Sequence, residues 1–277
     1  MKSLISTLIL LFSCFSLFAQ KYTFDNQHLT HDIGVFTGVY AMQSDYGQRY
    51  NFQSEVGNAA MSISLVHYLT FYNRNARWNA RYRLIDDIAI KTEINYMTTD
   101  NLRHHGKYVE AGGGPFSNRQ KLRDMRGSVS IFNFGVSGEY HFNDLRSFSA
   151  YYSEYKWNPY VSLGIMYSMY ENDLTTEHGD GDWRSDPTLL YTKWQDWRDR
   201  AVGKGSTGSA VLGAGIRYKL TERMDLSALG RWQYFFSDNV DGLNAKNRPE
   251  NKYNEWAISL QVGVIWHLNF SDPLRLF

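Results

Sequence analysis

Apolar and polar residues alternate along most of the chain with a period of two, which is typical of β-strands that are apolar on one face only. Eight segments show this alternation, and each is long enough to cross a bilayer as a tilted strand, which needs about 9 to 11 residues. We predict strands at 31–42, 60–71, 87–97, 128–142, 160–170, 209–220, 224–236 and 256–270.

The third segment shows which face must be covered by lipid. Ile88, Ile90 and Ile94 occupy one face, while Lys91 and Glu93 occupy the other. Two charges at alternate positions cannot face lipid, so this polar face points into the interior of a barrel. We therefore predict an all-β protein, a transmembrane up-and-down antiparallel β-barrel of about eight strands.

The connections between the segments agree with this assignment in part. Outer-membrane barrels have short periplasmic turns and long extracellular loops. The long outer loops are 43–59, 98–127, 171–208 and 237–255, and two of them contain Tyr108 and Trp183. The periplasmic connections are 72–86, 143–159 and 221–223. Two of these three connections are longer than typical periplasmic turns. The neighbouring strands could extend into them.

Aromatic residues make a membrane barrel more plausible than a soluble one. The chain has 20 Tyr, 16 Phe and 8 Trp, although its mean hydropathy is negative. A soluble β-sandwich or lipocalin-like barrel also alternates, but it turns polar residues outward and does not gather aromatic residues on one face. We expect two interfacial girdles, formed by Tyr40, Tyr72, Tyr96, Tyr140, Tyr170, Trp232, Tyr234, Trp256 and Trp266.

The beginning of the chain predicts export. A basic Lys2, an apolar stretch at 4–18 and a terminal Ala19 form a secretory signal peptide at 1–19, followed by one barrel domain at 20–277. Cys14 is the only cysteine, and the rival interpretation is a lipoprotein acylated there. Cleavage after Ala19 leaves no cysteine, which excludes disulfides and thiol chemistry. The expected location is the bacterial outer membrane.

Charges on the inward face predict a network inside the barrel. The chain has 29 Lys and Arg against 28 Asp and Glu, so nothing favours nucleic acid as a partner. The predicted network consists of Asp32, Lys91, Glu93, Glu139, His141, Arg217, Lys219, Arg231 and His267. Eight strands leave no aqueous pore, so we interpret these residues as mutually paired structural groups rather than a proton relay or a binding site.

The sequence gives little support for catalysis. Some eight-stranded outer-membrane barrels modify lipids with Ser, His and an acid, but no Gly-x-Ser-x-Gly motif occurs here. The acidic segment 177–182 lacks the ligand spacing of a calcium loop. We expect no catalytic, cofactor-binding or metal-binding residues and no small-molecule substrate. A lipid-modifying barrel enzyme is the alternative.

One part of the chain resembles a known family. Residues 30–38 (Thr-His-Asp-Ile-Gly-Val-Phe-Thr-Gly), 45–47 (Asp-Tyr-Gly) and 56–59 (Val-Gly-Asn-Ala) resemble the opening of the PorG-like outer-membrane barrels. Those barrels belong to the type IX secretion and gliding apparatus. Beyond residue 59 the resemblance is only architectural. It implies a structural or anchoring role in a protein secretion or gliding machine, through docking to periplasmic ring lipoproteins.

The two longer periplasmic connections are where such docking is expected. Arg and Tyr are enriched in protein interfaces. The candidate docking residues are Arg74, Arg77, Arg81, Arg83, Tyr151 and Tyr152. The alternative is that these segments only extend the strands below the membrane. The expected partners are outer-membrane lipids and a periplasmic ring lipoprotein or another protein of the secretion machine.

Overall fold

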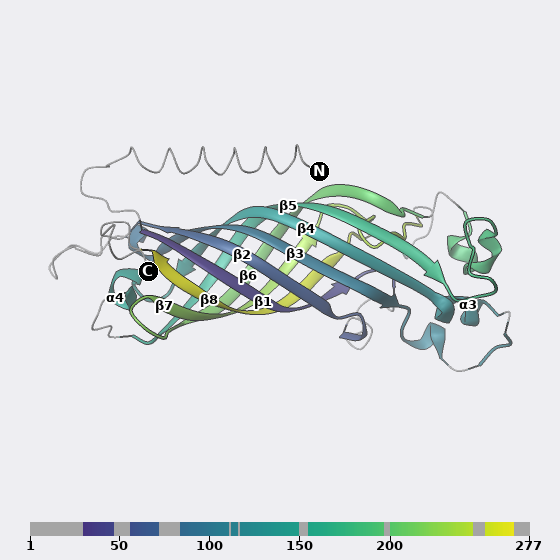
Figure 1. Ribbon diagram of the computed structural model, residues 1–277, viewed down its shortest axis with the longest axis horizontal. Coiled ribbons are helices and arrows are strands. Elements are labelled where there is room, and N and C mark those ends of the chain that lie inside the picture. Colours follow the sequence, from purple (N-terminus) through teal and green to yellow (C-terminus); the bar gives the residue numbers. More distant parts are fainter. Residues whose placement is uncertain are drawn as a thin grey trace.

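The chain folds into a closed barrel of eight antiparallel strands (Figure 1). The computed structural model describes residues 30–46, 56–71, 84–110, 112–115, 117–149, 155–196, 200–245 and 253–268. The strands follow in chain order, and β8 pairs with β1 to close the barrel. They are β1 (Thr30–Gln43), β2 (Ala60–Thr70), β3 (Ile88–Arg103), β4 (Met125–His141), β5 (Trp157–Thr176), β6 (Gly203–Lys219), β7 (Met224–Phe235) and β8 (Trp256–Leu268). The predicted up-and-down antiparallel barrel is confirmed.

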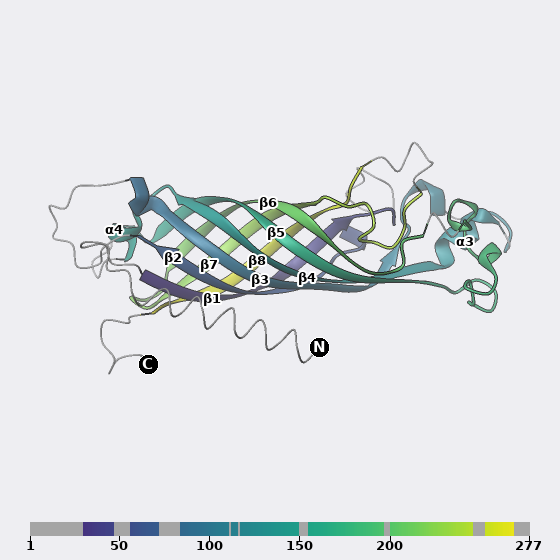
Figure 2. The ribbon, with the colours of Figure 1, turned by 90° about the horizontal axis from the view of Figure 1, so that it is seen from above.

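Short helices lie at the two ends of the barrel (Figure 2). The end that carries α3 (Asn118–Asp124) is called the loop end, and η2 (Lys107–Val109), η3 (Pro187–Leu189) and η4 (Thr192–Trp194) lie in its connections. The opposite end, called the turn end, carries η1 (Leu84–Asp87) and α4 (Leu145–Ser149). No helix in the described ranges is long and apolar enough to cross a membrane.

Several strands run further toward the loop end than predicted. β3 continues to Arg103, β5 continues to Thr176, and β6 begins at Gly203. The predicted loops 98–127 and 171–208 are therefore too long. Their ends lack an apolar outer face, so the alternation disappears there, but backbone pairing continues without it, as between Thr176 and Met125.

An apolar belt surrounds the outside of the barrel. Every strand contributes exposed aliphatic or aromatic side chains, while the intervening residues are buried in the lumen. The belt includes Val35, Ile63, Leu65, Phe134, Val136, Leu163, Ile165, Leu212, Leu226, Leu260 and Val262. An apolar surface that encircles a barrel is stable only under lipid, since soluble proteins rarely expose patches of more than a few hundred Å².

The aromatic girdle prediction is confirmed for some residues and wrong for others. Tyr96, Tyr140, Trp232 and Trp266 are exposed on the outer face, as expected. In contrast, Tyr40 (1% exposed) and Tyr170 (8%) point into the lumen. Both fall on the inward phase of their strands, and their bulk fills the barrel near the loop end. Tyr72 lies outside the described residues.

The lumen is closed at the loop end by an apolar cluster. The part of this cluster that lies within the barrel, called the lumen plug, contains Tyr40, Met42, Met97, Val129, Ile131, Tyr170, Phe235 and Ala257. It is continuous with the loop cap, which contains Tyr46, Leu102, Leu122, Leu174, Trp183, Leu190, Trp194, Val240 and Leu243. The outer loops thus have their own core. Trp183, assigned to an outer loop from the sequence, is only 7% exposed.

Val136→Arg tests which face of the strands contacts lipid and which faces the lumen. Val136 lies on the outer face of β4, midway between Phe132 and Tyr140, where an arginine costs about 2–4 kcal/mol of folding free energy. Urea titration of protein folded into lipid vesicles measures this loss. Asp100→Arg, at an exposed position above the belt on β3, is the control and should change stability little. Equal stability of both variants would mean that the faces are reversed.

Candidate functional site

The centre of the lumen holds a network of buried ion pairs built around Glu139. Its carboxylate accepts a hydrogen bond from Arg217 at 2.8 Å and lies 3.4 Å from the Lys91 ammonium. His141, two residues along β4, lies 3.6 Å from the same carboxylate. All four side chains are almost completely buried. The alternation of β3, β4 and β6 turns each of them inward, and closure of the barrel brings them together.

A second carboxylate, Glu93, completes this central network. Arg231 donates to Glu93 at 2.6 Å, and Lys91 lies 3.3 Å from the other oxygen of the same carboxylate. Lys91 therefore bridges the two carboxylates. The guanidinium of Arg217 also lies over the ring of Tyr68, at 4.2 Å from its centroid. Every charged group thus faces an opposite charge, which a buried charge requires.

A third ion-pair group lies in the same lumen, around His267. The two imidazole nitrogens of His267 contact Asp32 at 2.8 Å and Asp225 at 3.0 Å. Asp225 is not in the network predicted from the sequence, although it lies on the inward phase of β7 together with Ser227 and Arg231. The strand alternation alone was a sufficient signal to find it.

Lys219 was predicted to belong to the charge network in the lumen, but its side chain lies elsewhere. It lies at the turn end, where its ammonium donates a hydrogen bond to the Phe148 carbonyl at 3.0 Å. Phe148 belongs to α4, so Lys219 ties this helix to the end of β6. The other eight predicted residues all take part in the ion pairs described above.

A layer of amides and hydroxyls also crosses the lumen. Asn133 lies at its centre: its amide donates to Asn95 at 2.8 Å, and its oxygen accepts from Ser168 at 2.6 Å and Gln233 at 3.0 Å. Gln233 also donates to Ser209 at 2.9 Å. These residues lie on four strands besides β4 and hold the barrel walls at a set separation. None of these residues is in the network predicted from the sequence, although all are polar residues on the inward phase of their strands.

Together, the lumen plug, the amide layer and the ion pairs close the barrel to ions. A permeating ion would have to displace buried side chains that are paired by charge across the lumen. We therefore expect the purified protein to show no steady single-channel conductance in planar bilayers. A general porin measured in the same membrane is the control. Regular openings at constant amplitude from the purified protein would contradict the sealed lumen.

Two buried carboxylates lie together under the loop cap. Asp241 accepts hydrogen bonds from the backbone amides of Asp45 at 2.6 Å and Leu243 at 2.8 Å, and its own amide donates to Glu255 at 3.4 Å. Burial, followed by the charge of Asp45, raises the pKa of Asp241 to about 8. Burial and the neighbouring Asp241 raise the pKa of Glu255 well above its ordinary value.

The loop cap should therefore lose stability as the pH rises. The folded protein keeps a proton on Asp241 up to about pH 8, whereas the unfolded chain releases it near its ordinary pKa of 3.8. Stability then falls between these two values, because the folded state binds more protons. We expect the melting temperature of the cap, followed by tryptophan fluorescence, to be lower at pH 9 than at pH 5.

Asp241→Asn should remove most of this pH dependence. A change of about 1 kcal/mol corresponds to roughly 2–4 °C in a protein of this size, so the effect is measurable. The exposed carboxylate of Glu110, also at the loop end, provides the control variant Glu110→Gln, which should keep the wild-type pH profile. If Asp241→Asn also keeps that profile, other groups cause the pH dependence.

Some predicted features lie outside the described residues. These are the signal peptide at 1–19, the beginning of the barrel domain, and all the candidate docking residues, Arg74, Arg77, Arg81, Arg83, Tyr151 and Tyr152. They stay predictions. Within the described ranges, no group of three His, Cys, Asp or Glu side chains is arranged to hold a metal ion. In the acidic segment 177–182, Glu177 pairs with Arg126 at 3.0 Å.

Comparison with known proteins finds likeness in structure only. No protein-family model and no curated protein matches the sequence. The chain is similar in fold to a major outer membrane protein from Thermus thermophilus, with 12% identity, a TM-score of 0.46, and 87% of this chain and 100% of that chain covered. It is also similar to Ail, the attachment invasion locus protein of Yersinia pestis, with 9% identity, a TM-score of 0.42, and coverage of 86% and 98%. Neisserial surface protein A is similar with 13% identity, a TM-score of 0.40, and coverage of 86% and 98%. Structural similarity at this level of sequence identity shows the fold and does not indicate the function.

Proposed function

We propose that the protein is a non-enzymatic barrel of the bacterial outer membrane that acts as a structural or anchoring component of a protein secretion or gliding machine. The sealed lumen carries the proposal. Ion pairs around Glu139, Glu93 and His267 fill the barrel, and the lumen plug closes it toward the loop end. A barrel that is filled in this way meets other molecules only at its wall and its two ends.

The apolar belt and the connections orient the barrel in this proposal. The belt lies in the bilayer, and the loop end, with its long connections, faces the outside of the cell. The turn end then faces the periplasm, where a ring lipoprotein or another secretion-machine protein would bind. The lack of enzymatic activity stays a prediction.

Two observations support a partner at the turn end. Residues 30–38, 45–47 and 56–59 resemble PorG-like barrels, for which docking to periplasmic ring lipoproteins is implied. In addition, the described part of the turn end exposes apolar side chains beside the connections that carry the predicted docking residues. Leu84 on η1 is 67% exposed, and Phe142 and Leu220 are also exposed.

Site-specific photo-crosslinking in cells tests the proposal. A photoreactive amino acid at Leu84 should give a discrete adduct with a lipidated periplasmic protein, because this position lies at the proposed docking end. The matched position is Tyr108 at the loop end, which is 57% exposed and should not give that adduct. Mass spectrometry of the adducts identifies the partner. Adducts from Tyr108 alone would place the partner outside the cell and refute the anchoring role.

A further inference from the structure

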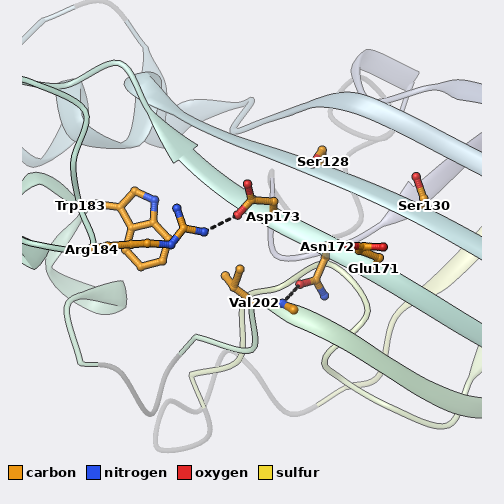
Figure 3. A pocket seen from close by; sticks show the side chains of 9 residues that line it. Ser128, Ser130, Glu171, Asn172, Asp173, Trp183, Arg184 and Val202 are labelled. Carbon is orange, nitrogen blue, oxygen red and sulfur yellow. Dashed lines mark hydrogen bonds and ion pairs between the residues drawn. The ribbon is translucent and has the colours of Figure 1, made fainter.

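A polar groove of about 640 Å³ lies on the outer wall of the barrel near the loop end (Figure 3). It lies between Ser128 and Ser130 of β4, residues 171–173 of β5, and the first residue of β6, with Trp183 and Arg184 of the loop cap at one side. The groove is independent of the lumen network and of the turn end, so it has no part in the proposed anchoring role.

The groove begins directly above the apolar belt. On the outer face, Phe132 of β4 pairs with Met169 of β5, and both belong to the belt. The next outward pair toward the loop end is Ser130 with Glu171, which lines the groove. Tyr96 marks the boundary, because its hydroxyl donates to Ser130 at 3.3 Å. The groove thus lies where lipid head groups begin.

The charged groups of the groove are in exposed ion pairs. Asp173 pairs with Arg184 at 2.8 Å, and Glu171 pairs with Lys204 across β5 and β6 at 3.0 Å. All four side chains are about half exposed or more. Exposed ion pairs of this kind contribute only about 0–1 kcal/mol, so their oxygens and nitrogens can exchange partners with a ligand at low cost.

The floor of the groove is held rigidly from the lumen side. The Asn172 side chain accepts a hydrogen bond from the Gly203 amide at 2.8 Å and donates to the Asn239 carbonyl at 2.9 Å. Gly203 has a φ of 137°, and no atom lies within 4 Å of the position that a Cβ would take. The absence of a side chain there leaves the groove open.

The groove offers both hydrogen-bond acceptors and donors, and a polyhydroxylated ligand can use both. The two carboxylates can accept hydrogen bonds from hydroxyls, and the serine hydroxyls can both donate and accept. Arg184 of the lining, and Lys204, which pairs with Glu171 beside the groove, can donate to ring oxygens or phosphates. The lining has two carboxylates and one guanidinium group, so a purely anionic ligand is not favoured. We propose that this groove binds the core saccharide of an outer-leaflet glycolipid. The ligand is lipid-borne because the groove opens at the rim of the belt, where the acyl chains of the same molecule can contact Phe132 and Met169.

Glycolipid retention by the purified full-length protein tests the proposal. The protein in detergent is incubated with lipopolysaccharide, with lipid A lacking the core saccharide, or with the oligosaccharide released from the same lipopolysaccharide. Bound lipid is then measured by mass spectrometry after affinity purification. We expect lipopolysaccharide to bind at least about tenfold more tightly than lipid A, a ratio equal to about 1.4 kcal/mol. The free oligosaccharide should compete only at higher concentrations.

A variant that fills the groove should abolish the preference for lipopolysaccharide over lipid A. Ser128→Trp fills the groove and should reduce lipopolysaccharide binding to the lipid A level. The matched control is Thr37→Trp, an exposed position on the outer face of β1, a strand that does not line the groove. If Ser128→Trp does not fold, the double variant Glu171→Gln with Asp173→Asn replaces it.

Three results would overturn the inference. Equal retention of lipopolysaccharide and lipid A would show that the core saccharide, which lipid A lacks, is not bound by the protein. Wild-type retention by a folded groove variant would place the saccharide elsewhere on the protein. Competition by the free oligosaccharide at equal concentration would show that the ligand is not lipid-borne. None of these results bears on the crosslinking at Leu84, so the groove and the anchoring role can fail separately.

Discussion

Replacing Glu139 by alanine is expected to lower the free energy of unfolding of the barrel by about 3–5 kcal/mol. The Glu139 carboxylate accepts from Arg217 at 2.8 Å and faces Lys91 at 3.4 Å inside a lumen that is almost inaccessible to water. Its removal leaves Arg217 buried without its carboxylate partner, and desolvation of that charge is no longer offset. Urea unfolding of the protein in lipid vesicles measures the loss.

Two further variants test this explanation. Glu171→Ala removes an exposed carboxylate that pairs with Lys204 on the outer wall, and it should cost no more than about 1 kcal/mol. The double change Glu139→Leu with Arg217→Met removes both buried charges and leaves Lys91 paired with Glu93 at 3.3 Å. It should recover much of the stability lost in Glu139→Ala. A double variant that is less stable than Glu139→Ala would mean that the cost comes from packing instead of charge.

Trp183→Ala should have an effect of similar size, confined to the loop cap. The indole nitrogen donates to the Leu174 carbonyl at 2.6 Å, and the guanidinium groups of Arg184 and Arg200 lie over the ring at 4.6 and 5.1 Å. Truncating a buried tryptophan to alanine costs about 3–5 kcal/mol. Because the contacts of this side chain lie in the cap and the adjoining end of β5, we expect the cap to open while the eight strands remain folded.

Limited proteolysis of the protein in vesicles measures this opening. Trp183→Ala should be cleaved within 177–202 much faster than the wild type, and the strands should remain as a protected barrel. Tyr108→Ala is the control, since Tyr108 is exposed at the same end and its truncation leaves no cavity. Resistance of Trp183→Ala equal to that of the control would show that the cap does not depend on this side chain.

The architecture of the barrel could be predicted from the sequence because strand alternation is local. Lys91 and Glu93 flank a single residue, so their shared face had to be the lumen, and the same reasoning assigned Glu139, Arg217 and Arg231. Asp225 followed from the same rule and was overlooked. A resemblance to a family was visible over a few short segments, but the candidate docking residues that it suggested lie outside the described residues.

The contacts between inward residues were decided only by the tertiary structure. Arg231 and Glu93 are 138 residues apart, and their pairing depends on the register of each strand and on closure between β8 and β1. The alternation of apolar and polar residues does not predict the polar extension of β5 beyond the belt, because backbone pairing requires no apolar face.

The loop cap also could not be predicted from the sequence alone. Its core joins Trp183 to Leu122 and Leu243 from three different connections, none of which shows a periodic pattern. The alternation along a strand thus determined which side chains face inward, since that depends only on neighbouring residues. Closure of the barrel determined which of them meet, because such contacts join residues that are far apart in the chain.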